Sequence, residues 1–256
     1  MVGVVRLRGG RLRVTRRELR SCIVVGCLLP GANAVLFFAE RRVPTGLASL
    51  LIASVPLWLV LYRLVGRERL PWQLLAGVGV GFVGVAVLAQ PSGGARLGGI
   101  GLCVLSALMW SSGSFYSARA TMPADPFAAT AYEMLAGGLV MLVPSLFTVH
   151  HFSPSAGSVG GWLYLVLVGS IVGYTAYVWL LANAPLGLLS TYAYVNPVVA
   201  ITLGVLFRGE QLSWRLLFGA AIVVAAVAAV VRRDPAAAPP PEETVVPEEV
   251  SDTVGV

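Results

Sequence analysis

Long apolar stretches recur along this chain, and each is long enough to cross a lipid bilayer as a helix. A helix needs ~20 residues to span the hydrocarbon core, whereas barrel strands are shorter segments of alternating hydrophobicity, which are not seen here. The pattern therefore predicts an all-α integral membrane protein, a multi-helix transmembrane bundle. The eight predicted spans are residues 21–39, 44–65, 72–90, 97–117, 126–149, 160–182, 187–207 and 213–231.

Composition agrees with a bilayer environment and argues against nucleic-acid binding. Of the 256 residues, 57% are hydrophobic and only 12% are charged, and the mean hydropathy is +0.82. A soluble domain carries about 25% charged residues. The net charge of +6 comes from 18 arginines, seven of which lie in residues 6–20, and most of the others flank apolar stretches. That placement is typical of a membrane surface, so we expect no nucleic-acid partner.

The arginines also predict how the chain is oriented. If both termini are cytoplasmic, the inner segments hold 13 arginines and the outer segments hold five. Because inner segments of membrane proteins carry the excess of basic residues, we expect a multi-pass cell-membrane protein with both termini in the cytoplasm. Residues 1–20 are then a basic cytoplasmic segment. The proline-rich, acidic residues 232–256 are expected to form a disordered cytoplasmic tail.

Two parts of the chain repeat each other. The span 213–231 is the fifth predicted span after its counterpart 72–90, and because that number is odd, the two cross the membrane in opposite directions. This predicts inverted repeats, the architecture of many secondary transporters. The first repeat, 21–90, has three spans, and the second, 97–231, has five. The repeat is carried by Pro44, Gly46, Leu47, Ser49 and Pro56 at a separation of 141, and by Glu68, Leu70, Trp72, Leu74, Leu75 and Gly77 at 142.

Several motifs together resemble the EamA family of the drug/metabolite transporter superfamily, over residues 21–231. They are Pro44–Ser49 with Pro56-Leu57-Trp58, the turn Gly66–Leu70, and Gly173–Tyr177 with Tyr192–Pro197. The resemblance implies ten helices in two inverted five-helix halves around a solute cavity, with the fifth helix of each half bracing the fold or pairing with a second subunit as a homodimer. Family members move amino acids, other metabolites or drugs, often outward. This chain lacks counterparts of the first two helices.

One carboxyl group is predicted to lie within the hydrocarbon region. Glu133 is seven residues into 126–149, or ~10 Å along the helix axis. A charge at such a depth is costly and usually has a function, here the binding of a proton or of a cationic solute group. The alternative is a structural hydrogen bond between helices.

Polar and aromatic residues within other spans are the remaining candidates for solute binding. Pro197 removes a backbone hydrogen bond from its helix, and local breaks of this kind often line transporter sites. We therefore expect Tyr192, Tyr194 and Asn196, which precede it, to contact solute. The other candidates, which could instead join helices to one another, are Trp110, Ser114, Tyr174, Tyr177 and Asn33.

These features favour a secondary-active transporter that exports small metabolites or drugs by alternating access. An intramembrane enzyme is disfavoured, because His150 and His151 are the only histidines and lie at a helix end, and the sequence has no hydrolase, zinc-protease or phosphate-loop motif. The three cysteines have no metal-type spacing, so we expect no metal and no cofactor. Because the first repeat is two helices short, a truncated, non-transporting membrane subunit or remnant is the alternative.

Overall fold

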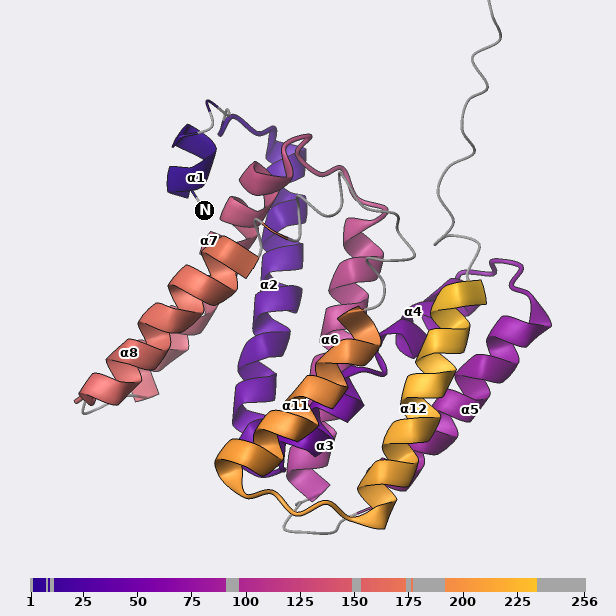
Figure 1. Ribbon diagram of the computed structural model, residues 1–256. Coiled ribbons are helices and arrows are strands. Elements are labelled where there is room, and N and C mark those ends of the chain that lie inside the picture. The colour runs from indigo at the N-terminus through magenta and orange to yellow at the C-terminus, as the bar shows by residue number, and fades with distance from the viewer. Residues whose placement is uncertain are drawn as a thin grey trace, which may run out of the picture.

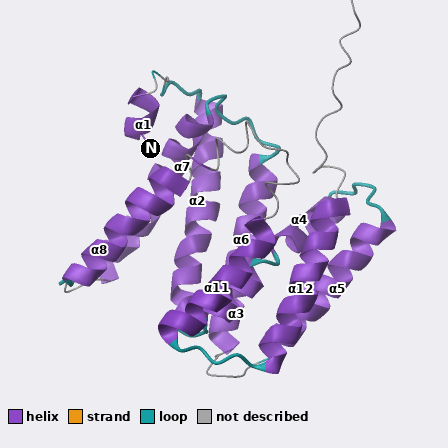
Figure 2. Ribbon diagram, viewed as in Figure 1, coloured by secondary structure: helices purple, strands orange, loops and turns teal. Residues whose placement is uncertain are grey.

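All regular structure in the described part of the chain is helical (Figures 1 and 2). A computed structural model describes residues 2–7, 9, 12–90, 97–148, 153–173, 176 and 192–233. This confirms the predicted all-α bundle. The elements are α1 (Val2–Leu7), α2 (Arg16–Glu40), α3 (Thr45–Ile52), α4 (Val55–Val65), α5 (Trp72–Leu88), α6 (Leu97–Ser117), α7 (Pro126–Thr148), α8 (Ala156–Tyr164), the π-helix η1 (Leu165–Gly173), α11 (Tyr192–Arg208) and α12 (Trp214–Arg233).

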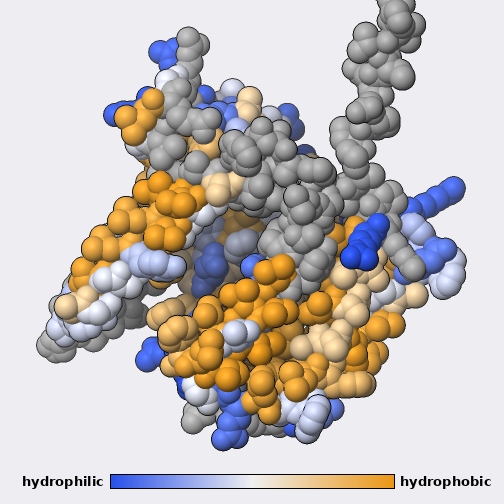
Figure 3. Space-filling model, viewed as in Figure 1, coloured by the Kyte–Doolittle hydropathy of each residue, from blue (hydrophilic) through white to orange (hydrophobic). Residues whose placement is uncertain are grey.

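Within the described residues, every predicted span contains apolar helix. Five stretches of the described residues are long and apolar enough to cross a bilayer: Arg16–Glu40, Thr45–Val65, Leu97–Ser117, Ala156–Gly173 and Trp214–Arg232. Three shorter apolar helices, Trp72–Leu88, Pro126–Leu142 and Val195–Arg208, occupy the remaining predicted positions. Large apolar side chains cover much of the face seen in Figure 3. Such a surface suits lipid rather than water, as expected of a multi-pass membrane protein.

The predicted span 44–65 is two helices rather than one. α3 ends at Ile52 and α4 begins at Val55, so the chain turns at Ala53 and Ser54. The Ser54 hydroxyl donates to the Leu51 carbonyl at 2.5 Å and accepts a hydrogen bond from the Trp58 indole at 3.2 Å. These bonds tie the broken segment together locally. The break lies beside Pro56, whereas α11 runs without interruption through the corresponding proline, Pro197.

Helix α2 begins five residues earlier than its predicted span. Thr15 and Glu18 form a capping box, in which the Thr15 hydroxyl accepts from the Glu18 amide at 3.2 Å and the Glu18 carboxylate accepts from the Thr15 amide at 2.6 Å. The box satisfies backbone donors that helix formation would otherwise leave unpaired. Part of the predicted basic segment 1–20 is therefore the first turn of a helix.

Helices α5 and α12 pack side by side and antiparallel (Figure 1). A Cβ on Gly77 would lie 3.2 Å from Val230 Cγ2, and at the other end of the pair a Cβ on Gly219 would lie 2.6 Å from Leu88 Cδ2. Gly77 corresponds to Gly219, and Leu88 to Val230, at the repeat separation of 142. Exchanging the repeats therefore converts one contact into the other.

The middle of this interface has the same symmetry. A Cβ on Gly81 would lie 3.3 Å from Ala226 Cβ, and a Cβ on Gly84 would lie 2.9 Å from Val223 Cγ2. The exchange maps the first of these contacts onto the second. Glycines at these positions let the two helices approach closely, as small residues do between helices in membranes. The arrangement agrees with the inverted relation that the sequence predicts for these two helices.

A second group of helices forms around α2, which packs against α6 and α7. The Ser106 hydroxyl of α6 donates to the Ala32 carbonyl of α2 at 2.7 Å. A Cβ on Gly113 would lie 2.8 Å from Leu29 Cδ2, so α6 approaches α2 closely as well. This group carries four of the predicted site residues.

Candidate functional site

Glu133 lies where α7 crosses α2. A Cβ on Gly137 would lie 2.5 Å from the Gly26 carbonyl oxygen, and a Cβ on Gly26 would clash with the Glu133 carbonyl oxygen. The two backbones are therefore in direct contact at this level, and bulkier residues at either glycine would force them apart. The Glu133 residue is half-buried beside the crossing.

Three more predicted residues lie on the helices that surround this crossing. Asn33 is exposed on α2, where its amide group donates to the Leu29 carbonyl at 3.4 Å. Trp110 and Ser114 are half-buried on α6 and, four residues apart, share one face. Glu133 of α7 lies level with Gly26 of α2. Asn33 is seven residues further along α2, so it lies ~10 Å from that level along the helix axis. The structure places these residues on adjacent helices but at different depths.

The remaining predicted residues can be followed only in part. Tyr174 and Tyr177, and the side chains of Tyr192 and Tyr194, lie outside the described part of the structure. Asn196 is exposed on α11. Figure 3 shows the surface hollowed between α8 and α11, with hydrophilic residues at the bottom of the hollow. Contact of these residues with a solute stays a prediction.

Sequence reasoning missed a polar seam between α4 and α6. The Tyr62 hydroxyl lies 2.9 Å from the Ser112 hydroxyl, and the Tyr62 ring packs against Phe115 at a centroid distance of 5.6 Å. The Ser111 hydroxyl lies 3.3 Å from the Val55 carbonyl, at the start of α4. The seam therefore connects α6 to the helix that follows the break. Its sequence signal was the placement of Tyr62 one turn after Trp58, on the same helix face.

At one end of the bundle, Glu68 interacts with two arginines. The Arg63 guanidinium donates to Glu68 at 2.7 Å, and Arg119, from the connection between α6 and α7, also donates to this carboxylate. Arg119 additionally stacks 3.7 Å above the Phe115 ring. The hydrogen bond from Arg63 is the main cause that lowers the pKa of Glu68.

At the opposite end, Glu210 binds the backbone of α3. Its carboxylate accepts from the Thr45 amide at 2.7 Å and from the Gly46 amide at 3.1 Å. These amides are at the start of α3, where backbone donors have no partner within the helix. A Cβ on Gly204 would lie 2.6 Å from a Glu210 carboxylate oxygen, so only glycine leaves the carboxylate room there. Burial raises the pKa of Glu210, but the bonds from Thr45 and Gly46 outweigh it, and the net pKa is lowered.

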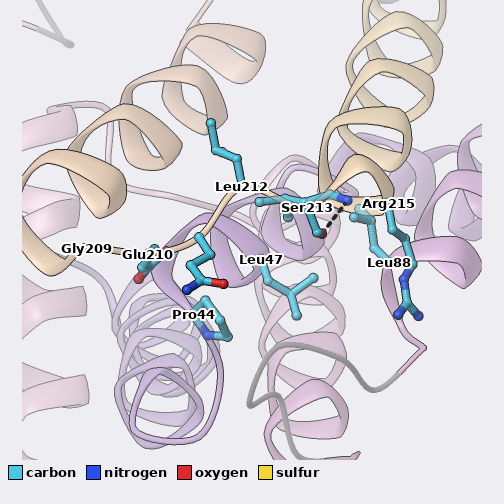
Figure 4. A pocket seen from close by; sticks show the side chains of 10 residues that line it. Pro44, Leu47, Leu88, Gly209, Glu210, Leu212, Ser213 and Arg215 are labelled. Atoms are coloured by element: carbon cyan, nitrogen blue, oxygen red, sulfur yellow. Dashed lines mark hydrogen bonds between the residues drawn. The ribbon is translucent and has the colours of Figure 1, made fainter.

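A cavity of about 440 Å³ lies beside Glu210, between the α11–α12 connection and the first repeat (Figure 4). Pro44, Leu47 and Leu88 form its apolar side, and Ser213 and Arg215 contribute polar groups. The Ser213 hydroxyl accepts from the Leu216 amide at 3.1 Å, which caps α12, and Arg215 donates to the Gln90 side chain at 3.2 Å. The volume falls within the range of small-molecule sites.

Metal ligation has no candidate group in the described ranges. No three His, Cys, Asp or Glu residues gather there in an arrangement that could hold a metal ion. The cysteines are free thiols, and two of them, Cys22 and Cys103, are buried among apolar side chains.

Comparison with known proteins identifies transporters. The model of the EamA-like transporter family matches residues 97–232. The "Uncharacterized inner membrane transporter YedA" of Escherichia coli (strain K12) is 36% identical over 217 residues, which cover 81% of this chain and 69% of that protein. The "Probable terminal-alkyne amino-acid exporter" of Streptantibioticus cattleyicolor is 29% identical, over 84% of this chain and 75% of that protein.

A further relative and a solved structure agree with these matches. The "Probable amino-acid metabolite efflux pump" of Salmonella typhimurium is 26% identical over 75% of this chain and 69% of that protein. A crystal structure superposes with a TM-score of 0.59 at 23% identity, covering 90% of this chain and 82% of that chain. This last likeness concerns the fold alone.

Proposed function

The chain belongs to the EamA-like transporter family, and from this premise we propose that it exports a small metabolite by secondary-active, alternating access. A multi-pass membrane transporter of small molecules is the function to which the family and the relatives point, rather than an enzyme. The observation that carries the proposed mechanism is the antiparallel α5–α12 pair, whose contacts repeat under exchange of the two halves. In inverted-repeat transporters one half rocks against the other around a central site.

The α5–α12 pair is suited to be the axis of that motion. Its contacts extend from Gly77 with Val230 to Leu88 with Gly219, and Val223 and Val227 on α12 are fully buried. A closely packed pair holds the halves together while their other contacts change. The break between α3 and α4 and the π-helix η1 supply irregular backbone within spans, which transporters use to line solute paths.

An amino acid or an amino-acid derivative is the solute class we propose. The names of two relatives refer to amino-acid export, which supports this choice. Glu133 would pair with the solute's ammonium group or carry the coupled proton, and the Trp110 ring offers a face for a cation or an aromatic side chain. Asn33, Ser114 and Asn196 would supply hydrogen bonds. Tyr174, Tyr177, Tyr192 and Tyr194 complete the proposed set.

The proposed orientation has both termini in the cytoplasm. The start of α2 and the end of α12 lie at the same end of the bundle (Figure 1), together with Glu68 and Arg119. This end would then be cytoplasmic, and the connection that carries Glu210 would face outward. The arginine distribution along the sequence supports this assignment. A homodimer stays a prediction of the sequence.

The test is export from vesicles that contain the purified chain. Inside-out proteoliposomes would be supplied with a panel of radiolabelled amino acids, with and without an imposed proton gradient, and uptake compared with empty liposomes. We expect gradient-dependent uptake of at least one amino acid or derivative. No uptake of any panel member, by a chain that is monodisperse and correctly inserted, would contradict the proposal.

A further inference from the structure

Glu68 and Glu210 occupy equivalent turns at opposite ends of the molecule. They are 142 residues apart, the separation of the repeat. Each follows a residue with a left-handed backbone, and both of these residues, Arg67 and Gly209, have a φ of 62°. Each amide also folds back onto the preceding helix, from Glu68 to the Arg63 carbonyl at 3.0 Å and from Glu210 to the Gly204 carbonyl at 3.1 Å. The first bond spans five residues and the second six, so two similar turns project a carboxylate at each end.

Each carboxylate joins the first repeat to the second. Glu210, in the second repeat, binds the first two amides of α3 in the first repeat. Glu68, in the first repeat, binds Arg119 in the second. The two glutamates thus bridge the halves at opposite membrane surfaces, but with different partners.

The difference between the two partners has a local cause in the sequence. Arg63, which holds Glu68, corresponds to position 204 or 205 of the second repeat, and these positions are Gly and Val. No arginine competes for Glu210 from that position, and the absent side chain of Gly204 leaves the space that the carboxylate fills. Arg208 is 4.0 Å away and 70% exposed, so its interaction with Glu210 is screened by solvent.

The two bridges also differ in strength. The Glu210 side chain is 16% exposed and accepts two hydrogen bonds from fixed backbone donors. Hydrogen bonds to an ionised, shielded acceptor are among the stronger ones in proteins. The Arg119 and Glu68 side chains are 47% and 35% exposed, and exposed ion pairs contribute little. The bridge at Glu210 is therefore the stronger of the two.

We propose that Glu210 and Glu68 are unequal latches of the transport cycle, and that the carrier rests closed at the Glu210 end until this carboxylate leaves the amides of α3. The inference rests on the proposed alternating access. In alternating access the two halves exchange conformations, so that the carrier opens at the other membrane surface. The α5–α12 contacts persist, because this exchange maps them onto one another. Glu68 does not bind helix backbone amides as Glu210 does, so the exchange does not preserve the Glu210–α3 bridge. This bridge must therefore break for the Glu210 end to open.

Cysteine accessibility tests the latch. Leu47 is 6% exposed and lines the cavity beside Glu210. Leu47→Cys would be introduced after Cys22, Cys27 and Cys103 are replaced by alanine, and labelled with a membrane-impermeant maleimide in oriented proteoliposomes. Loss of a charged acceptor for two amides should shift the equilibrium enough for Glu210→Gln to raise the labelling rate about tenfold. Glu68→Gln, the matched change at the other end, should not raise it.

A control reporter and a second variant keep the result decisive. Gln211→Cys is exposed on the same connection and should label equally in all backgrounds. If Glu210→Gln aggregates, Gly204→Ala displaces the same carboxylate by its added Cβ, and should likewise speed labelling of Leu47→Cys. Equal Leu47→Cys labelling in the parent and in the folded variant would overturn the latch.

Failure of the latch and failure of the proposed function give different results. If amino-acid export is normal but the labelling rate of Leu47→Cys is the same with and without Glu210→Gln, the latch is overturned and the proposed transport function is retained. Labelling that responds to Glu210, in a chain that moves no amino acid, would support the latch and contradict the proposed solute class.

Discussion

Gly84 of α5 lies directly against Val223 of α12, so that a Cβ at position 84 would come within 2.9 Å of Val223 Cγ2. A Cβ added to Gly79, on the same helix, would have no neighbouring atom within 4 Å. The two glycines therefore separate the effect of helix contact from that of glycine itself.

Gly84→Val should destabilise the protein by about 1–3 kcal/mol, because the added side chain overpacks the α5–α12 interface. Gly79→Val should be close to neutral, since its side chain would face open space. Thermal unfolding of both variants in the same detergent measures the difference. Equal melting temperatures for the two variants would show that the interface tolerates separation.

Glu133→Gln should abolish the dependence of transport on an imposed proton gradient, because an amide cannot carry the proton. Residual exchange of solute without a gradient is compatible with an intact fold. Glu40→Gln, at an exposed helix end, is the matched control and should keep the gradient dependence. A Glu133→Gln variant with the parent's pH profile would remove this residue from proton coupling.

The two left-handed turns predict different effects of substitution on stability. Gly209 has a φ of 62°, and a side chain in that conformation costs roughly 1–2 kcal/mol. Gly209→Ala should therefore lower stability by about that amount. Arg67→Gly, at the equivalent turn, relieves the same strain but adds freedom to the unfolded chain, so little net change is expected. Chemical unfolding monitored by tryptophan fluorescence compares the two, and a larger loss for Arg67→Gly would contradict this account.

The stability contributed by Glu210 should depend on pH. Its folded-state pKa is lowered below the ordinary value of 4.5, so the folded protein favours the ionised carboxylate. The contribution is then fully present above pH 4.5 and is lost as the pH falls through the folded-state value. The melting temperature of the parent should exceed that of Glu210→Gln at neutral pH, and the gap should narrow in acid. A gap that widens in acid would mean that the carboxylate is not an acceptor of the α3 amides.

The positions of the membrane helices were predictable, whereas their interruptions were not. Hydropathy locates a span such as 97–117 because a mostly apolar stretch of ~20 residues is stable in lipid as a helix. The turn at Ala53 and Ser54 arises from bonds among Leu51, Ser54 and Trp58 whose formation hydropathy does not report. Proline was a misleading guide, since Pro197 lies inside a continuous helix.

The bond from Glu210 to α3 shows another limit of sequence reasoning. Its partners are backbone amides 165 and 164 residues away, and an amide carries no residue identity that a sequence pattern could reveal. The available signals were the recurrence of Glu at the repeat separation and the glycine at 204. Glu133, by contrast, was predictable as an acid within an apolar helix, and its role stays a prediction.

The α5–α12 interface is self-complementary, as in a two-fold symmetric dimer where both subunits present the same patch. Gly77 and Gly219 are equivalent positions in the two repeats and make equivalent contacts, with Val230 and Leu88 respectively. A segment such as α5, given a second copy running the other way, already carries both surfaces needed to pair with it. Each position in the α5–α12 interface is therefore constrained twice, once by the residue that it contacts and once through the equivalent residue of the other repeat. A change in helix spacing at one end has to be matched at the other.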